Sequence, residues 1–268
     1  LFLAPGASLP TDGSVTLSGA TAKLDLNGTL QQIGTLSSGS LTTGGTIDLG
    51  AGTLTVNQSA DQRFVGIISG VGGSLTKQGS GTLTLSSDNT YSGATTVQAG
   101  TLSLTGSSGA TRHAGTGIDV ASGATLDINN VTLDTPNLSI AGLGVGGAGA
   151  LTGTGVATYS RAVTLINDAR IGGSGTLTLG DPVQETGGAR QLSKTGSGTL
   201  TLSGHNTYSG GTDIAAGTLF LTPGASLPTD GSVTLSGATA KLDLNGPLQQ
   251  IGTLSSGGLT TGGTLDLG

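Results

Sequence analysis

A long internal duplication is the feature that most constrains how this chain folds. Residues 1–50 recur as residues 219–268, an offset of 218 residues, with 46 of 50 positions identical. A chain that lengthens by whole cassettes must place each cassette against the one before it, as stacked repeat proteins do. Because the chain begins and ends within a repeat, we expect it to be a segment of a longer array. Any targeting or anchoring segment is then expected outside it.

The composition indicates an ordered all-β protein with too few aromatic side chains for an ordinary globular core. The chain has 52 Gly, three Tyr and three Phe, and it has no Cys, Met or Trp. Only 9% of its residues are charged, with 15 acidic against nine basic side chains. No basic patch is present to neutralise phosphates, which argues against a nucleic-acid partner. No run of about 20 apolar residues is present to form a membrane-spanning helix.

Short apolar/polar alternations closed by Gly, Asn or Asp recur along the chain. A period of two residues predicts β-strands, with Leu83 and Leu85 pointing inward while Thr82 and Thr84 face solvent. Similar segments are found at residues 14–19, 22–28, 52–56, 81–85, 100–104, 124–128, 175–179 and 198–202.

Short strands at this spacing fit a sandwich, a barrel or a β-solenoid. A sandwich needs large side chains to fill the roughly 10 Å between its sheets, and this chain has few. A parallel β-helix fills its narrow interior with stacked Leu, Val, Ile, Ala and Thr, and its corners use Gly and Asn. We therefore predict one continuous parallel β-helix over residues 1–268, with about 20 to 25 residues per coil and roughly 11 to 13 coils.

A second repeat lies within the cassette, where residues 75–104 and 192–221 are identical at 21 of 30 positions. Both segments resemble the passenger-associated repeat of bacterial autotransporters, which has the sequence pattern L-x-K-x-G-x-G-T-L-x-L-x-x-x-N-x-Y-x-G. The motif positions are Lys77, Gly79, Gly81, Asn89, Tyr91, Gly93 and Gly100 in the first copy and Lys194, Gly196, Gly198, Asn206, Tyr208, Gly210 and Gly217 in the second.

This resemblance implies a right-handed parallel β-helix that is carried to the outside of a Gram-negative cell. It also implies a C-terminal outer-membrane barrel as a partner of this segment, lying beyond residues 1–268. The chemistry of the motif residues points to structural roles. Asn89 and Asn206 suit corners, where an amide can bond backbone groups, and Tyr91 and Tyr208 offer apolar plates that cap a coil edge.

The sequence gives little sign of catalytic chemistry. His113 and His205 are the two side chains with a neutral-pH base, and the second repeat places His205 where the first has Asp88. No G-x-S-x-G or Gly-Asp-Ser-Gly sequence is present. Residues 142–147 fit G-x-G-x-x-G, but the Gly-rich segment after them cannot form the helix that a dinucleotide site requires. We predict no enzyme activity, no cofactor and no metal.

Asp25, Asp127 and Asp243 share a Leu-Asp-(Leu/Ile)-Asn context and form an acidic stripe only if their coils stack in register. A solvated outward face is the interpretation that we favour for them, and cation binding is the alternative.

The function that we expect is that of a non-enzymatic passenger at the bacterial surface, acting in adhesion, in self-association and biofilm formation, or as a projecting stalk. Its partners are then neighbouring passengers, a host or abiotic surface, or glycan. The alternatives are a polysaccharide-binding or polysaccharide-cleaving β-helix and an ice-binding solenoid. Ice binding is suggested by Thr-x-Thr pairs that begin at Thr53, Thr82, Thr176 and Thr199.

Overall fold

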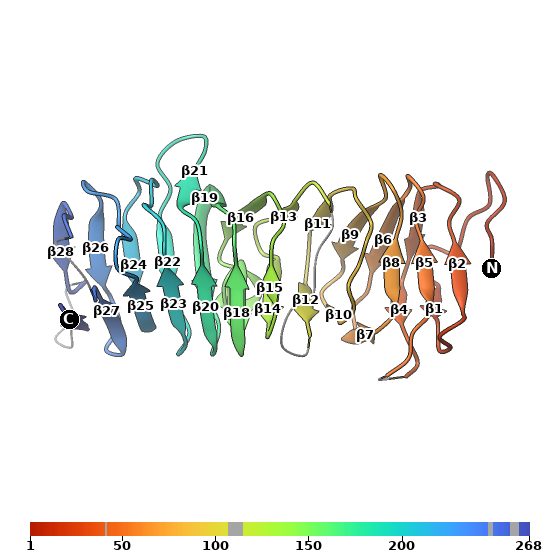
Figure 1. The fold of residues 1–268 in the computed structure, drawn as a ribbon, viewed down its shortest axis with the longest axis horizontal. Coiled ribbons are helices and arrows are strands. Elements are labelled where there is room, and N and C mark those ends of the chain that lie inside the picture. The colour runs from red at the N-terminus through yellow and green to blue at the C-terminus, as the bar shows by residue number, and fades with distance from the viewer. Residues whose placement is uncertain (41, 107–114, 246–248, 258–262) are drawn as a thin grey trace.

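The chain forms a rod of parallel β-coils that stack along one axis, with its termini at opposite ends (Figure 1). The computed structural model describes residues 1–40, 42–106, 115–245, 249–257 and 263–268. These residues make a β-solenoid of about 11 turns. Paired strands are separated along the chain by 19 to 27 residues, which is slightly wider than the range predicted from the turn spacing. The predicted all-β solenoid is confirmed.

The strands form three faces. In face 1 each strand pairs with the equivalent strand of the next coil. The first two strands of this face are connected to the third by a hydrogen bond from Ser38 N to Arg63 O. The strands of face 1 are β1 (Ser14–Thr16), β4 (Thr35–Ser37), β7 (Gln62–Phe64), β10 (Thr82–Leu85), β12 (Thr101–Thr105), β14 (Thr125–Asn129), β17 (Leu151–Thr154), the second half of β19 (Val163–Gly172), β22 (Leu192–Lys194), β24 (Thr212–Ile214), β26 (Ser232–Leu235) and β28 (Thr253–Ser255).

Face 2 shares the long strand β19 with face 1, because β19 turns the corner between them and pairs on both sides. Its strands are β3 (Gln31–Ile33), β6 (Thr53–Asn57), β9 (Ser74–Gln78), β11 (Thr95–Val97), β13 (Ile118–Val120), β16 (Leu138–Gly142), the first half of β19 and β21 (Val183–Glu185). Face 3 consists of β2 (Lys23–Asp25), β5 (Thr46–Asp48) and β8 (Ile67–Ser69) near the N-terminus, and then β15 (Thr132–Leu133), β18 (Val156–Tyr159), β20 (Thr176–Leu179), β23 (Thr199–Leu202), β25 (Gly217–Leu221), β27 (Ala240–Asp243) and β29 (Thr264–Asp266).

Stacked aliphatic side chains fill the interior. Along face 1, Leu83, Leu102, Leu126 and Leu151 follow one another in register, and all four are fully buried. The outward residue Thr84 is partly exposed, as the period-two pattern predicted. These coils thus add successive layers of Leu to an apolar column, which stabilises the rod through the hydrophobic effect.

The two copies of the duplicated sequence fold alike. Strands β26 and β28 repeat β1 and β4 on face 1, and β27 and β29 repeat β2 and β5 on face 3. The register is also repeated, since Ser14 pairs with Thr35 and Ser232 with Thr253. The 218-residue offset therefore corresponds to a whole number of turns.

A short 3₁₀ turn lies between two strands in the middle of the rod. Val145–Gly147 forms a short 3₁₀ turn (η1) between β16 and β17, and Gly146 within it has a left-handed φ of 58°. This is the stretch that fits G-x-G-x-x-G, and it leads into the strand β17, so the prediction that no helix follows it is confirmed. None of the described residues lies in a helix long and apolar enough to cross a membrane.

Candidate functional sites: the repeat motif and the outer faces

The lysine of the repeat motif lies inside the coil. Lys77 is fully buried on β9, and its Nζ donates to the carbonyl oxygens of Gln78 at 2.6 Å, Gly79 at 2.8 Å and Ala99 at 3.2 Å. Burial lowers the pKa of Lys77 to about 8. The ammonium thus provides hydrogen-bond donors for three carbonyls that converge at a corner of two successive coils.

The second copy repeats this arrangement. Lys194 on β22 is almost fully buried, and its Nζ donates to the carbonyl oxygens of Thr195 at 2.7 Å, Gly196 at 3.0 Å and Ala216 at 3.0 Å. Burial lowers the pKa of Lys194 to about 8 as well. The lysine therefore closes the equivalent corner of the motif in both copies, and it does so by bonding backbone carbonyls.

The motif glycines stack beside this ammonium because successive backbones come too close for a side chain. A Cβ atom on Gly100 would lie 2.3 Å from the carbonyl oxygen of Gly79 and 2.5 Å from that of Gly81, and Gly100 has a left-handed φ of +66°. The second copy forms the same stack with Gly196, Gly198 and Gly217. Similarly, a Cβ atom on Gly93 or Gly210 would approach a backbone oxygen of the preceding coil to 2.5 Å.

The Asn and Tyr residues of the motif form hydrogen bonds within the rod. Asn89 Oδ1 accepts a hydrogen bond from Ile68 N at 2.9 Å, and Asn206 Oδ1 accepts one from Val183 N at 2.8 Å. In both copies the amide oxygen thus bonds a backbone N–H of the preceding coil. Tyr91 is fully buried, with its hydroxyl 2.6 Å from Thr95 Oγ1, and Tyr208 lies at the same distance from Thr212 Oγ1. Burial raises the pKa of both tyrosines.

The two motif copies are rotated by one face relative to each other. The first copy uses β9 and β11 on face 2 and β10 and β12 on face 1, whereas the second uses β22 and β24 on face 1 and β23 and β25 on face 3. The internal contacts are nevertheless the same. The motif is therefore a self-contained corner unit that does not have to point in one direction around the rod.

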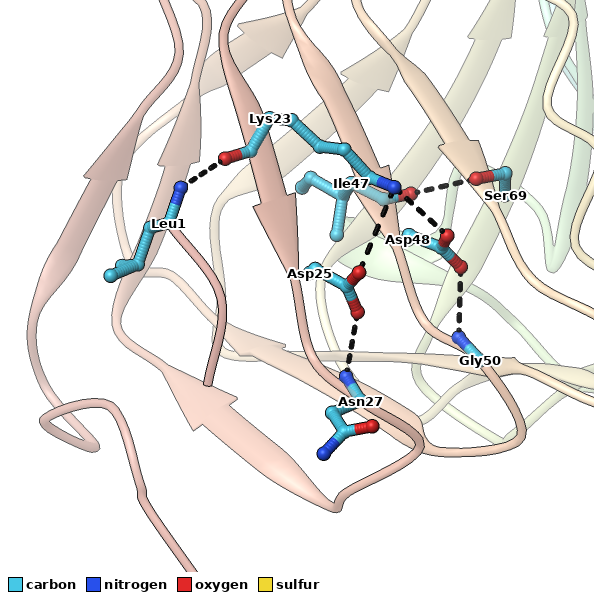
Figure 2. Close-up of polar contacts among 8 residues, drawn as sticks. All are labelled: Leu1, Lys23, Asp25, Asn27, Ile47, Asp48, Gly50 and Ser69. Carbon is cyan, nitrogen blue, oxygen red and sulfur yellow. Dashed lines mark hydrogen bonds and ion pairs between the residues drawn. The ribbon is translucent and has the colours of Figure 1, made fainter. Parts of the chain in front are cut away.

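Aspartates stack in pairs on face 3, each pair with one lysine. Asp25 and Asp48 are paired across β2 and β5, and Lys23 Nζ lies 3.6 Å and 3.4 Å from their carboxylates (Figure 2). Asp25 also accepts a hydrogen bond from Asn27 N, and Asp48 accepts one from Gly50 N (Figure 2). The carboxylates thus fix the turns that follow their strands.

The second cassette repeats the pair. Lys241 Nζ lies 2.9 Å from both Asp243 and Asp266, and these two carboxylates raise the pKa of Lys241. The structure does not bring Asp25, Asp127 and Asp243 together as a stripe, because Asp127 lies on face 1 and the other two lie near opposite ends of face 3. Within the described ranges, no three His, Cys, Asp or Glu side chains are grouped to hold a metal ion.

His205 forms an exposed contact with a serine. Its Nδ1 lies 3.1 Å from Ser226 Oγ, and the hydrogen bonds of the described residues include no carboxylate that orients the ring. A hydrolytic triad needs such an orienting group. His113, the other candidate base, lies outside the described residues.

The Thr-x-Thr pairs are divided among the three faces. The pair beginning at Thr53 lies on face 2, the pair at Thr82 on face 1, and the pairs at Thr176 and Thr199 on two adjacent coils of face 3. Thr201, in the last pair, is also 9% exposed and so contributes little surface. These pairs do not form one flat array.

A longer polar ladder runs along face 2. One outward side chain from each of eight successive coils stacks in register, and only one of the eight is charged. The ladder consists of Gln32, Thr55, Thr76, Thr96, Asp119, Ser139, Thr164 and Gln184, all partly or fully exposed. We call it the face 2 ladder. Sequence reasoning missed it because the residues are unevenly spaced along the chain.

Together, the parallel solenoid and the corner motif define a β-helix like that of autotransporter passengers. Residues 75–104 and 192–219 match the passenger-associated-transport-repeat, which confirms the resemblance found in the sequence.

A distant homologue supports the same class. The chain is 35% identical over 230 residues to a protein named Adhesin BmaC autotransporter, from Brucella suis biovar 1 (strain 1330). This similarity covers 84% of the chain and 6% of the relative, so the chain corresponds to a small part of that protein. No solved structure matches the chain.

Proposed function

We propose that this chain is part of a non-enzymatic, surface-exposed passenger that acts through its lateral faces in self-association and adhesion. The observation that carries the proposal is the face 2 ladder, which offers hydroxyl and amide groups once per coil with a single charge. Such a ladder can form many weak hydrogen bonds with a copy of itself or with a flat polar surface. Repetition along the rod then multiplies these contacts through effective concentration.

The route to the surface is part of the same proposal. Export across an outer membrane, with a membrane barrel as the anchor, is supported by the two passenger-associated-transport-repeats and by the relative named as an autotransporter adhesin. The repeat residues themselves hold the coil together in this proposal, since their polar groups are bonded within the chain. The outward-facing side chains are then the ones that contact other passengers or a surface.

Display on a non-clumping bacterium tests the proposal. Zero, one and three copies of the 218-residue cassette are displayed, and aggregation is followed by settling and microscopy. We expect aggregation to rise steeply with copy number. Aggregation that does not depend on copy number, while an outer tip domain moves further from the cell, would instead show a stalk.

Matched substitutions identify the face that acts. Thr96→Lys with Thr164→Lys places two like charges on the face 2 ladder, and we expect it to reduce aggregation between identical cells. Thr158→Lys with Thr178→Lys adds the same charges to neighbouring coils of face 3 and serves as the control. Equal loss with both variants would show a nonspecific effect of net charge.

A further inference from the structure

A groove of about 430 Å³ lies on the outer surface of face 1, away from the face 2 ladder. Its floor is formed by β12, β14 and β17, where the outward residues Ser103, Asp127 and Thr152 stack in register. Its wall includes the η1 segment. The groove is open to solvent, and seven of its 11 lining residues are Ser or Thr, although most of its exposed surface is apolar.

The floor has an ordered hydrogen-bond arrangement around one carboxylate. Asp127 Oδ1 accepts hydrogen bonds from Thr152 Oγ1 at 2.9 Å and Thr154 Oγ1 at 2.8 Å, and Oδ2 accepts one from Ser103 Oγ at 2.9 Å. Ser103 and Thr152 are buried, whereas Asp127 and Thr154 are partly exposed. Because the Thr154 hydroxyl donates to Asp127, its own lone pairs are left to accept hydrogen bonds from a ligand. The second carboxylate oxygen also has capacity for a further donor.

The wall is held in place by two side chains from below. Thr125 Oγ1 accepts a hydrogen bond from Val145 N at 2.9 Å and donates to the carbonyl oxygen of Gly149 at 2.8 Å. Arg170 Nη1 donates to the carbonyl oxygen of Gly147 at 3.0 Å. The groove is therefore preformed, which reduces the ordering cost of binding.

The chemistry of the lining restricts the class of ligand. A single carboxylate whose hydroxyl neighbours already donate to it is a poor cation cage, since Ca²⁺ takes six to eight oxygen ligands. The same carboxylate repels anions. Acceptors aligned along the floor suit a ligand rich in hydroxyl donors, and Val145 and Ala148 provide apolar contacts beside them.

We propose that this groove binds a neutral carbohydrate chain, with Asp127 and Thr154 accepting hydrogen bonds from sugar hydroxyls and Ser103 and Thr152 orienting the carboxylate from the floor. This inference rests on the proposed adhesive function and names the class of ligand that the adhesive surface takes. The site differs from the ladder on face 2, so the two surfaces can be tested separately.

The test uses the purified 268-residue chain and isothermal titration calorimetry. The probes are linear hexasaccharides of glucose, mannose and N-acetylglucosamine, with polygalacturonate, a lysine decapeptide and Ca²⁺ as contrasting ligands. We expect at least one neutral hexasaccharide to bind and Asp127→Asn to weaken that binding at least tenfold. Asp213→Asn is the matched control, because Asp213 is also a partly exposed outward residue of face 1.

Thr154→Val provides a second variant that removes one hydroxyl with little change of shape, in case Asp127→Asn does not fold. The proposal is overturned if no neutral hexasaccharide binds, if binding survives both groove variants, or if the decapeptide, polygalacturonate or Ca²⁺ is the preferred ligand of the groove. Because this assay contains no cells, its failure leaves the display result intact. Failure of displayed cassettes to adhere or aggregate would instead contradict the proposed function.

Discussion

The buried lysines show how one side chain can satisfy three backbone carbonyls at a corner. A buried ammonium without a carboxylate partner is costly unless its protons are satisfied. Lys77 and Lys194 each satisfy theirs with three carbonyl oxygens that converge at the corner. The motif lysine is therefore a structural donor, even though a lone lysine in a sequence is usually taken for a surface residue.

These lysines predict an unusual pH dependence. Their ordinary pKa of 10.5 in the unfolded chain falls to about 8 in the folded protein, so the unfolded state binds more protons between these values. The free energy of unfolding should therefore rise from pH 7.5 to pH 9.5, by more than about 1.4 kcal/mol, the equivalent of one pKa unit. Urea unfolding followed by circular dichroism measures this.

The control separates the lysines from other groups. Lys77→Met with Lys194→Met should flatten the dependence, whereas Lys23→Met, on an exposed lysine, should keep it. The buried tyrosines act in the opposite direction only above about pH 10, because burial raises their pKa. A wild-type stability that is constant or falls across the window would contradict the lowered pKa of the two lysines.

The glycine stack predicts a steric cost beyond that of backbone conformation. Gly100→Ala introduces a Cβ atom 2.3 Å from a backbone oxygen, so we expect a loss of more than about 3 kcal/mol in unfolding free energy. Gly123 has a similar positive φ, but no atom lies within 4 Å of an added Cβ. Gly123→Ala should therefore lower the unfolding free energy by only about 1–2 kcal/mol. Equal losses in thermal or urea unfolding would mean that the close approach at Gly100 relaxes freely.

At the scale of strands, the register of β10 has a direct test. Leu83 is fully buried between stacked side chains, and the adjacent Thr84 points outward. Leu83→Asp should unfold the rod or open it locally, because it buries an unpaired charge. Thr84→Asp should change stability by less than about 1 kcal/mol. Equal melting temperatures for these two variants would contradict the inward and outward assignment.

The strands were predictable from the sequence because each is a local pattern of two-residue period. The corner geometry was only partly predictable: Asn89 and Tyr91 were assigned to structural roles, but the three carbonyls around Lys77 come from two coils. The groove and the face 2 ladder depend on which residues stack. Asp127 lies 24 residues after Ser103 and 25 residues before Thr152, and such unequal steps cannot be derived from strand patterns alone.

At the scale of the whole molecule, a solenoid is stabilised by neighbouring coils, so its stability depends on position. The duplicated cassette isolates this effect. Leu36 and Ile47 are fully buried, but their copies Leu254 and Leu265 are 45% and 39% exposed. In the isolated 268-residue chain, amides of β28 and β29 should therefore exchange with solvent faster than those of β4 and β5 in hydrogen-exchange mass spectrometry. Equal protection would show that coil position does not govern stability in this rod.

The whole-number turn count of the cassette has a genetic consequence. Nearly identical copies of a coding sequence permit unequal crossing-over, which adds or deletes one cassette at a time. The strands β26, β27, β28 and β29 lie on the same faces as β1, β2, β4 and β5. A gain or loss of one cassette therefore leaves every later strand on its own face of the rod. Lineages can thus vary the length of such a rod by recombination without changing what it presents along each side.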